Sequence, residues 1–209
     1  MPIVNIDAFI LIERNFGKPD FEHVKYVRKN RRRTGCASGY VRFTLRYETG
    51  IDLNRNYDIH FDTSSKGASK NRCDIEYQGP KAFSEPETRA IQNLVLNTPN
   101  LVSALNIHAY ANLWIFPYSY DTDPKSNLIK LTNHRLWTAY KEFVDLAPFG
   151  VGVRYGDAVN TIGYSATGEA SDWMLHHKNI FAFSPELGAD SEESKTFYPD
   201  IDGQLESLR

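Results

Sequence analysis

The sequence predicts an α/β fold: a single-layer, mixed, mostly parallel β-sheet flanked by helices. Three observations support this prediction. A capped amphipathic helix is expected at 84–98, a largely apolar segment follows it at 101–110, and a second amphipathic helix at 136–147 precedes another short apolar segment at 179–183. Helices that alternate with apolar strands are typical of layered α/β architectures, in which the strands run mainly parallel.

The first helix has recognisable start and stop signals. We expect Ser84 to cap it, Glu87 to close a capping box three residues later, and Pro86 to be tolerated in the first turn. Pro99 ends the helix. Its core-facing side is predicted to consist of four apolar residues with helical spacing: Ala90, Ile91, Leu94 and Val95.

The segments that follow complete the predicted sheet and its cover. Residues 101–110 are expected to form a buried strand that ends in His-Ala-Tyr. The second helix is stopped by Pro148 and Gly150. Residues 179–183 are expected to form a second buried strand, bounded by the Ser-Pro pair that follows them.

Length and charge set limits on the function. A chain of 209 residues, 41% of them hydrophobic, can bury a substantial core and fits one globular domain. The 24 Lys and Arg against 26 Asp and Glu give a net charge of −2, so no global field attracts nucleic acid, and no nucleic-acid partner is expected. The longest apolar stretches, 8–12 and 113–117, are far shorter than the ~20 residues of a membrane-spanning helix, so no membrane span is expected.

The N-terminus and the cysteines bear on the cellular compartment. Asn5 and Asp7 interrupt the apolar run that a secretory signal would need, so no signal peptide is predicted in this chain. Cys36 and Cys73 are too few for a disulfide scaffold or a four-thiolate metal site. They are compatible with one disulfide or with two free thiols.

Three places concentrate reactive side chains. His108 and Glu186 follow the two predicted strands, and polar groups at the carboxyl ends of parallel strands gather in a common crevice. Asn54 next to Arg55 could present an amide and a forked cation to one carboxylate. Each place also has an ordinary interpretation: a core histidine, a surface carboxylate and a solvated turn.

The order of seven segments decides between these interpretations, because it resembles the zinc carboxypeptidases, a family of metallocarboxypeptidases of the carboxypeptidase A/B type. The resemblance covers nearly the whole chain, in segments 2–7, 27–30, 50–57, 79–88, 107–110, 163–173 and 183–187. It implies a zinc-dependent enzyme that hydrolyses the C-terminal peptide bond of peptides and proteins. It also implies a monomer that acts outside the cell or in a secretory or lysosomal compartment.

The resemblance assigns three residues to the chemical step. His108 would be a zinc ligand, since a neutral imidazole suits Zn²⁺. Glu186 would be the general base that deprotonates the attacking water and passes the proton to the leaving amine. Arg28 would stabilise the oxyanion that develops on the scissile carbonyl.

Five further residues are assigned to substrate binding. Asn54, Arg55 and Tyr164 would hold the free C-terminal carboxylate, and Tyr110 would line the peptide groove. Ser171 falls at the base of the specificity pocket. Because an acid there would favour Lys or Arg, the neutral Ser171 predicts a preference for neutral or apolar C-terminal residues. The resemblance also implies a disulfide between Cys36 and Cys73, as in secreted members.

Two of the three expected zinc ligands are missing. The family draws them from a His-x-x-Glu motif upstream of the matching segments, and none of the six histidines here is followed three residues later by Glu. One imidazole does not make a catalytic zinc site. We therefore expect 1–209 to be a partial catalytic domain, truncated at both ends and inactive as printed. The alternative is a non-catalytic module that binds C-terminal carboxylates without zinc.

Overall fold

A mixed β-sheet organises the part of the chain that the structure describes. The computed structural model describes residues 3–19, 21–36, 49–63, 67–123, 125, 128–146 and 153–188. Its sheet has the strand order β1-β5-β3-β4, with β2 also paired to β5. The strands are β1 (Ser103–Leu105), β2 (His108–Ala109), β3 (Leu113–Ile115), β4 (Arg154–Gly156) and β5 (Phe181–Leu187).

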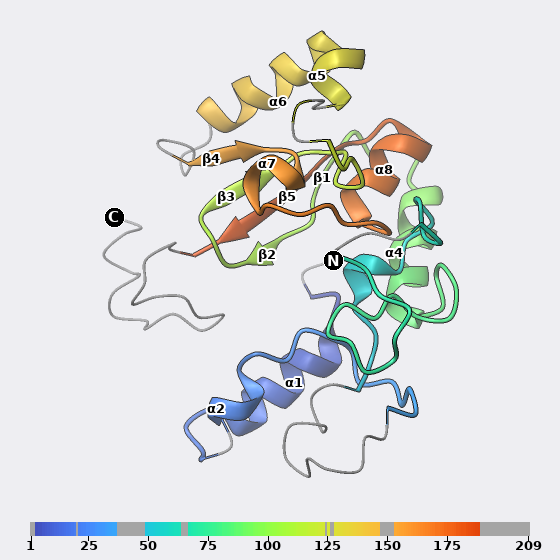
Figure 1. Cartoon of the computed structure of the whole chain (residues 1–209), viewed down its shortest axis with the longest axis vertical. Coiled ribbons are helices and arrows are strands. Elements are labelled where there is room, and N and C mark those ends of the chain that lie inside the picture. The colour runs from blue at the N-terminus through green and yellow to red at the C-terminus, as the bar shows by residue number, and fades with distance from the viewer. Residues whose placement is uncertain are drawn as a thin grey trace.

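Most strand pairs in this sheet are parallel. β5 runs parallel to both β1 and β2, and β3 runs parallel to β4. The β3–β5 pair is antiparallel. Helices cover the sheet, with α5 and α6 on one side and α8 and α4 beside its other end (Figure 1). The predicted mixed, mostly parallel sheet flanked by helices is therefore confirmed.

The segment predicted as one buried strand at 101–110 is divided in two. β1 and β2 both lie along the same side of β5, with Asn106 and Ile107 between them. The expectation of burial was wrong: Val102 is 76% exposed and Ile107 is 61% exposed. The physical reason is that, among the described strands, none pairs with the outer edge of β1.

The last strand extends further than its sequence boundary suggested. Ser184 and Pro185 were expected to end a strand at 179–183, but both lie inside β5. Pairing with β2 on one side and β3 on the other continues β5 beyond the proline. Glu186 therefore lies within a strand, not after one as predicted, and its position is fixed by two neighbours.

The two predicted helices are present, with one different cap. α4 spans Pro86–Leu96, and its N-cap is Glu85, not Ser84. The Ser84 hydroxyl instead donates to Glu85 Oε1 at 2.7 Å, so no capping box forms. α6 (His134–Leu146) agrees with the second predicted helix and follows a short helix, α5 (Leu128–Thr132).

Alternation along β5 separates two hydrophobic clusters, because successive side chains of a strand point to opposite faces. Phe183 packs with Trp114, Phe116, Tyr140 and Val144, and the last two come from α6. Ala182 belongs to the other cluster. Residues 184 and 186 share the face of Ala182, so this alternation places Ser184 and Glu186 on the side of the sheet away from α6.

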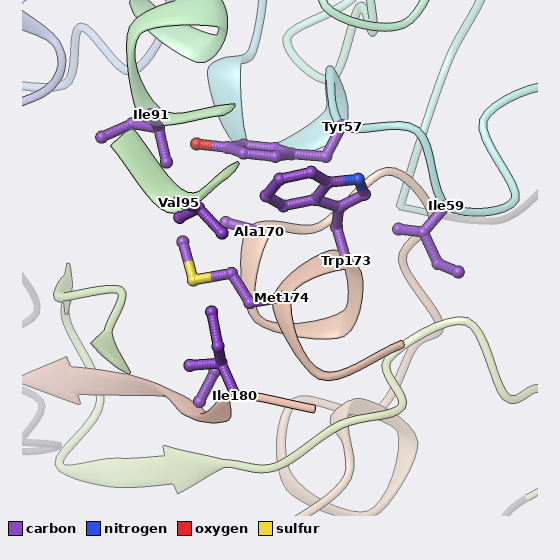
Figure 2. Packing of buried hydrophobic residues seen from close by; sticks show 9 residues of the cluster. Tyr57, Ile59, Ile91, Val95, Ala170, Trp173, Met174 and Ile180 are labelled. Carbon is purple, nitrogen blue, oxygen red and sulfur yellow. The ribbon is translucent and has the colours of Figure 1, made fainter. Parts of the chain in front are cut away.

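The second cluster joins α4, α8 (Ala170–Lys178) and the segment around Tyr57. Figure 2 shows the Trp173 ring against Tyr57, and their ring centroids are 5.9 Å apart. Met174 fills the space between Val95 and Ile180 (Figure 2). This packing fixes the start of α8, where the site described below is built.

The N-terminal helices α1 (Ile6–Asn15) and α2 (Phe21–Val24) pack around a smaller cluster of Ala8, Val24 and Val27. They lie at the opposite end of the molecule from α5 and α6 (Figure 1). The Asn5 amide donates to the Arg28 carbonyl at 2.8 Å and so joins this region to the site. Among the described helices, none is long and apolar enough to cross a membrane.

Candidate active site

His108 and Glu186 meet because their strands are paired in register. His108 in β2 is the partner of Glu186 in parallel β5. Residues opposite each other in adjacent strands project from the same face of the sheet. Asn106, two residues before His108, donates to Ser184 Oγ at 3.3 Å, which adds a second polar pair on this face. The chain thus brings an imidazole and a carboxylate together from two distant segments. These segments are 78 residues apart, which is the sequence separation of Asn106 and Ser184.

The His108 ring is held as a neutral acceptor. Its Nε2 lies 3.0 Å from Asn54 Nδ2 and 3.1 Å from Asn106 Nδ2, and both amide nitrogens are donors. Burial, assisted by the positive charge of Arg28, lowers the pKa of His108 to about 4. A neutral imidazole is the form that binds metal ions.

Glu186 is poised to exchange protons near neutral pH. Burial raises the pKa of its carboxyl to about 7, although the nearby Arg28 and Arg55 oppose the shift. A general base works best when its pKa lies near the operating pH. The carboxyl therefore has the property expected of a proton acceptor at this position.

Arg28 is fixed by a buried carboxylate that the sequence interpretation did not single out. Its Nε donates to Asp52 Oδ2 at 2.7 Å, and the Asp52 side chain is only 2% exposed. Burial opposes ionisation of Asp52, but the charges of Arg28 and Arg55 hold its pKa below the usual value. In turn, the charge of Asp52 raises the pKa of Arg28. The pair presents a permanent cation at the edge of the cavity.

Arg55 comes from a short 3₁₀ turn, η1 (Leu53–Arg55), which is anchored to the loop before α8. The Tyr57 amide donates to the Gly168 carbonyl at 3.0 Å. A Cβ at Gly168 would lie 2.2 Å from the Arg55 carbonyl oxygen, and Gly168 has a φ of +71°, so only glycine fits here. The Arg55 guanidinium donates through Nε to the Gly67 carbonyl and through Nη1 to the Asn54 carbonyl.

One cavity collects all six residues that the resemblance assigned to the chemical step and to carboxylate binding. Tyr164 enters it from the loop after α7 (Ala158–Thr161), and its ring lies so close to Gly67 that a Cβ there would be 2.8 Å away. A broader groove adjoins the cavity and shares His108 with it. The six residues in the cavity wall are Arg28, Asn54, Arg55, His108, Tyr164 and Glu186.

Glu169 also lines this cavity, and the sequence interpretation missed its importance. Its Oε2 accepts from the hydroxyls of Ser119 at 2.7 Å and Ser171 at 2.9 Å. Its Oε1 accepts from Ser184 Oγ at 2.7 Å and Asn54 Nδ2 at 3.2 Å. Burial opposes ionisation, but the hydrogen bonds from Ser119 and Ser184 help to hold the pKa of Glu169 below its usual value.

A second buried carboxyl, Asp172, lies next to Glu169. Its Oδ2 accepts from the Ser119 amide at 2.7 Å and the Tyr120 amide at 3.3 Å. Burial and the neighbouring Glu169 raise the pKa of Asp172 well above its usual value. The pKa values of the two neighbouring carboxyls are therefore shifted in opposite directions.

Two predicted substrate-binding residues do not line this cavity. Ser171 is fully buried, and its hydroxyl contacts Glu169 and Ser184, not the cavity. Tyr110 is half-buried and does not contribute to the described cavity wall. The signal that could have revealed Glu169 is the presence of an acid two residues before Ser171 in a loop of small residues.

The metal-ligating residues do not form a complete set. Among the described residues, no group of three or more His, Cys, Asp or Glu side chains is arranged to hold a metal ion. His108 supplies one suitable donor. The described donors therefore do not fit a catalytic zinc ion, which needs three protein ligands.

Cys36 and Cys73 form a disulfide, with 5.1 Å between their Cα atoms. The alternative of two free thiols, which the sequence left open, is therefore excluded. The bridge closes the segment that contains Asn54 and Arg55. It restricts the unfolded chain most strongly around this part of the site.

Comparison with known families explains why these residues converge. The family model described as zinc carboxypeptidase matches residues 1–206. The chain belongs to the zinc carboxypeptidase family. The predicted family is thereby confirmed over nearly the whole sequence.

The curated relatives that this chain matches are longer than the chain itself. Carboxypeptidase A6 of Mus musculus is 30% identical over 190 residues, which are 90% of this chain and 38% of that protein. Carboxypeptidase B of Bos taurus is 32% identical over 191 residues, 90% of this chain and 40% of its own length. The chain thus spans about two fifths of these relatives.

Solved structures support the fold. The crystal structure of carboxypeptidase A from Helicoverpa armigera matches all of this chain and 46% of its own chain, with a TM-score of 0.66 and 23% sequence identity. Bovine thrombin-activatable fibrinolysis inhibitor, solved with a tick carboxypeptidase inhibitor, matches with a TM-score of 0.63 and 24% identity. At these identities the structural matches establish the common fold alone.

Proposed function

We propose that residues 1–209 are part of the catalytic domain of a metallocarboxypeptidase that hydrolyses the C-terminal peptide bond of peptides and proteins. The observation that carries this proposal is the convergence of Arg28, Arg55, Tyr164, His108 and Glu186 in one cavity. These residues come from four separate parts of the chain: the segment after α2, η1, the sheet and the loop before α8. A fold without a site would not need two cations and a carboxylate of raised pKa there.

The carboxylate end of the substrate is assigned to Arg55, with Tyr164 beside it. A guanidinium has five N–H groups, and the described backbone contacts of Arg55 use two of them. Asn54 also lines the cavity, but its amide already bridges His108 and Glu169. In our proposal Arg55 is therefore the main hydrogen-bond donor to the substrate carboxylate. Asn54 instead holds the side chains of His108 and Glu169 in place.

The chemical step is assigned to Glu186 and Arg28. Glu186 accepts a proton from the attacking water and then transfers it to the nitrogen of the departing amino acid, so that the carboxylate is regenerated. Arg28, held by Asp52, stabilises the negative charge on the carbonyl oxygen as the water adds. The groove adjoining the cavity provides space for the residues that precede the C-terminal one.

The family implies one zinc ion, and His108 is its proposed ligand in this chain. When bound, such an ion activates water and polarises the carbonyl. The described residues supply one of the three ligands that such an ion needs, and the proposed roles of Glu186 and Arg28 involve protein groups alone.

The 209-residue chain should not retain zinc, because a single imidazole leaves the ion mostly hydrated. Metal analysis after dialysis against metal-free buffer checks this, with His108→Ala as the comparison. We expect both proteins to be essentially zinc-free. Stoichiometric zinc in the unaltered chain would reveal a ligand set that includes residues outside those described.

Release of single C-terminal residues tests the proposed activity. A longer protein that contains this chain should shorten a peptide one residue at a time from its free C-terminus, and mass spectrometry follows the products. Cleavage within the peptide, or none at all, would contradict the proposal. The alternative of a non-catalytic carboxylate-binding module has no use for Glu186 or Arg28, and their presence in the cavity favours the enzyme.

Three further properties belong to the proposal. The disulfide supports the predicted extracellular, secretory or lysosomal location, since such bonds persist in oxidising compartments. A monomer remains the expected state. The preference for neutral or apolar C-terminal residues, predicted from Ser171, stays a prediction.

A further inference from the structure

Glu169 is a buried acid of the cavity wall to which the proposed hydrolysis assigns no role. It is 3% exposed, and its carboxylate accepts four hydrogen bonds, three from hydroxyls and one from an amide. Arg28 and Arg55 line the same cavity, so positive charge is already present there. All four donors are protein groups, and the carboxylate therefore acts within the protein by holding other side chains in place.

The turn that carries Arg55 is not joined to the sheet by its backbone. The described backbone hydrogen bonds of residues 51–57 stay within this turn or reach other loops, and none of them reaches a described strand. The proposed base, Glu186, lies in β5. Side chains must therefore set the distance between the residue that holds the substrate carboxylate and the residue that exchanges the proton.

One oxygen of Glu169 bridges this turn and β5. Its Oε1 accepts from Asn54 Nδ2 at 3.2 Å and from Ser184 Oγ at 2.7 Å. Asn54 precedes Arg55 in the turn. Ser184 lies two residues before Glu186, on the same face of β5. A single buried atom thus joins the two segments that carry the proposed functional groups.

The Asn54 amide has no hydrogen-bonding capacity left for a ligand. Its Nδ2 donates to His108 as well as to Glu169, and its Oδ1 accepts from the Ala170 amide and from Asn106 Nδ2, both at 3.0 Å. A side-chain amide offers two N–H groups and two lone pairs, and all four are used here. The start of α8 therefore holds this amide from one side, and the sheet holds it from the other.

We propose that Glu169 is a positioning residue that sets the distance between Arg55 and Glu186. The proposal rests on the proposed function, in which Arg55 holds the C-terminal carboxylate and Glu186 returns a proton to the nitrogen of the same amino acid. One carbon separates that nitrogen from the carboxylate in an α-amino acid, so the two protein groups must keep one fixed spacing. A rigid link has a large effect, because a misplacement of about 1 Å can cost on the order of 10²-fold in rate.

The test compares two isomeric ligands that differ in this spacing. Acetyl-Gly-Gly-Ala and acetyl-Gly-Gly-β-alanine contain the same atoms and carry the same charge, but β-alanine places one more carbon between the nitrogen and the carboxylate. Isothermal titration calorimetry on the 209-residue chain should show the alanine peptide binding about tenfold or more tightly. The longer residue cannot contact Arg55 and Glu186 together, and a hydrogen bond to a charged group contributes an effect of this size.

Two further ligands serve as controls. Acetyl-Gly-Gly-Gly has the α spacing without the methyl group, so it should share most of the preference over β-alanine. The amide of the alanine peptide lacks the carboxylate, and it therefore tests carboxylate recognition separately from spacing.

Three variants assign the spacing to Glu169. Glu169→Ala removes both links and should reduce the preference to about twofold or less. Glu169→Gln keeps an oxygen for Asn54 and Ser184, so it should retain the preference, which a role based on charge would not allow. Ser184→Ala breaks only the link to β5 and should lower the preference to about threefold. The matched control is Tyr140→Phe, which removes a buried 2.9 Å hydrogen bond from α6 to the Ala182 carbonyl of β5 and should leave the preference unchanged.

The ratio of the two affinities separates positioning from structural support. A merely structural role of Glu169 would weaken both isomers equally, so an unchanged ratio in Glu169→Ala, shown to be folded by circular dichroism, overturns the inference. If Glu169→Ala does not fold, an unchanged ratio in Ser184→Ala overturns it instead. Loss of the preference in folded Glu169→Gln would show that the charge matters and not the geometry, which also overturns it.

The unaltered chain separates this inference from the proposed function. Equal binding of the two isomers overturns the inference, while tighter binding of the alanine peptide than of its amide still supports carboxylate recognition. If the acid and the amide bind equally, the proposed function fails, and the inference fails with it.

Discussion

Glu186→Gln should reduce turnover by about 10²-fold or more in a longer protein that contains this chain and has activity, while peptide binding stays nearly unchanged. Glutamine keeps the shape of the side chain but cannot accept the proton of the attacking water, and general-base catalysis typically contributes 10²–10⁴-fold. The loss should therefore appear in kcat, with little change in KM. Steady-state kinetics on one peptide over a range of concentrations provides the measurement.

Two further variants make this result specific. Asp145→Asn removes an exposed carboxylate from α6 and should leave kcat unchanged. Arg28→Ala should also act mainly on kcat, because the cation is needed most as the carbonyl oxygen becomes negative. It leaves Asp52 buried without its partner, so its thermal stability is measured in parallel. If both Glu186→Gln and Arg28→Ala raised only KM, the roles assigned to the two residues would be wrong.

The helices were predictable because their signals are local. The apolar spacing around Ile91 and the prolines that flank it placed α4 within two residues of its observed bounds. The cap was not predictable in the same way. Glu85 takes that place because Ser84 hydrogen bonds to Glu85 and to the Asn56 amide, which comes from a distant part of the chain.

The strands show where local reasoning ends. Pro185 marks a strand end in isolation, yet β5 continues through it because two neighbouring strands are paired there. The register between β2 and β5, which brings His108 to Glu186, depends on that pairing. The sequence predicted that the two residues gather at one edge of the sheet, but it did not reveal the pairing that places them opposite each other.

Glu169 illustrates a residue that the sequence interpretation missed, because its local signal is weak. As a single letter it is an acid in a loop, and such residues are usually exposed. It becomes a buried anion only because Asn54, Ser119, Ser171 and Ser184 supply donors from separate parts of the chain. The character of the pocket therefore depends on long-range packing and not on the neutral Ser171 alone.

Arg55→Ala should weaken the binding of a peptide with a free C-terminus by about 10- to 150-fold, and it should have much less effect on the corresponding amide. A hydrogen bond to a charged group contributes roughly 1.5–3 kcal/mol, and about 1.4 kcal/mol corresponds to each factor of ten in affinity. The amide lacks the carboxylate that Arg55 holds, so it has little to lose. The measurement is a two-by-two calorimetric comparison of both proteins with the free-acid and amide forms of acetyl-Gly-Gly-norleucine.

The control separates recognition from structural support, since Arg55 also donates to the carbonyls of Gly67 and Asn54. Arg89 is an exposed arginine that likewise donates to two backbone carbonyls, those of Phe83 and Ser84, and it lies on α4 outside the cavity wall. Arg89→Ala removes the same charge and similar backbone contacts, so it should leave the preference for the free acid unchanged. Equal losses on the acid and the amide in Arg55→Ala would rule out carboxylate recognition by Arg55, because a ligand without a carboxylate feels only the structural part of the change.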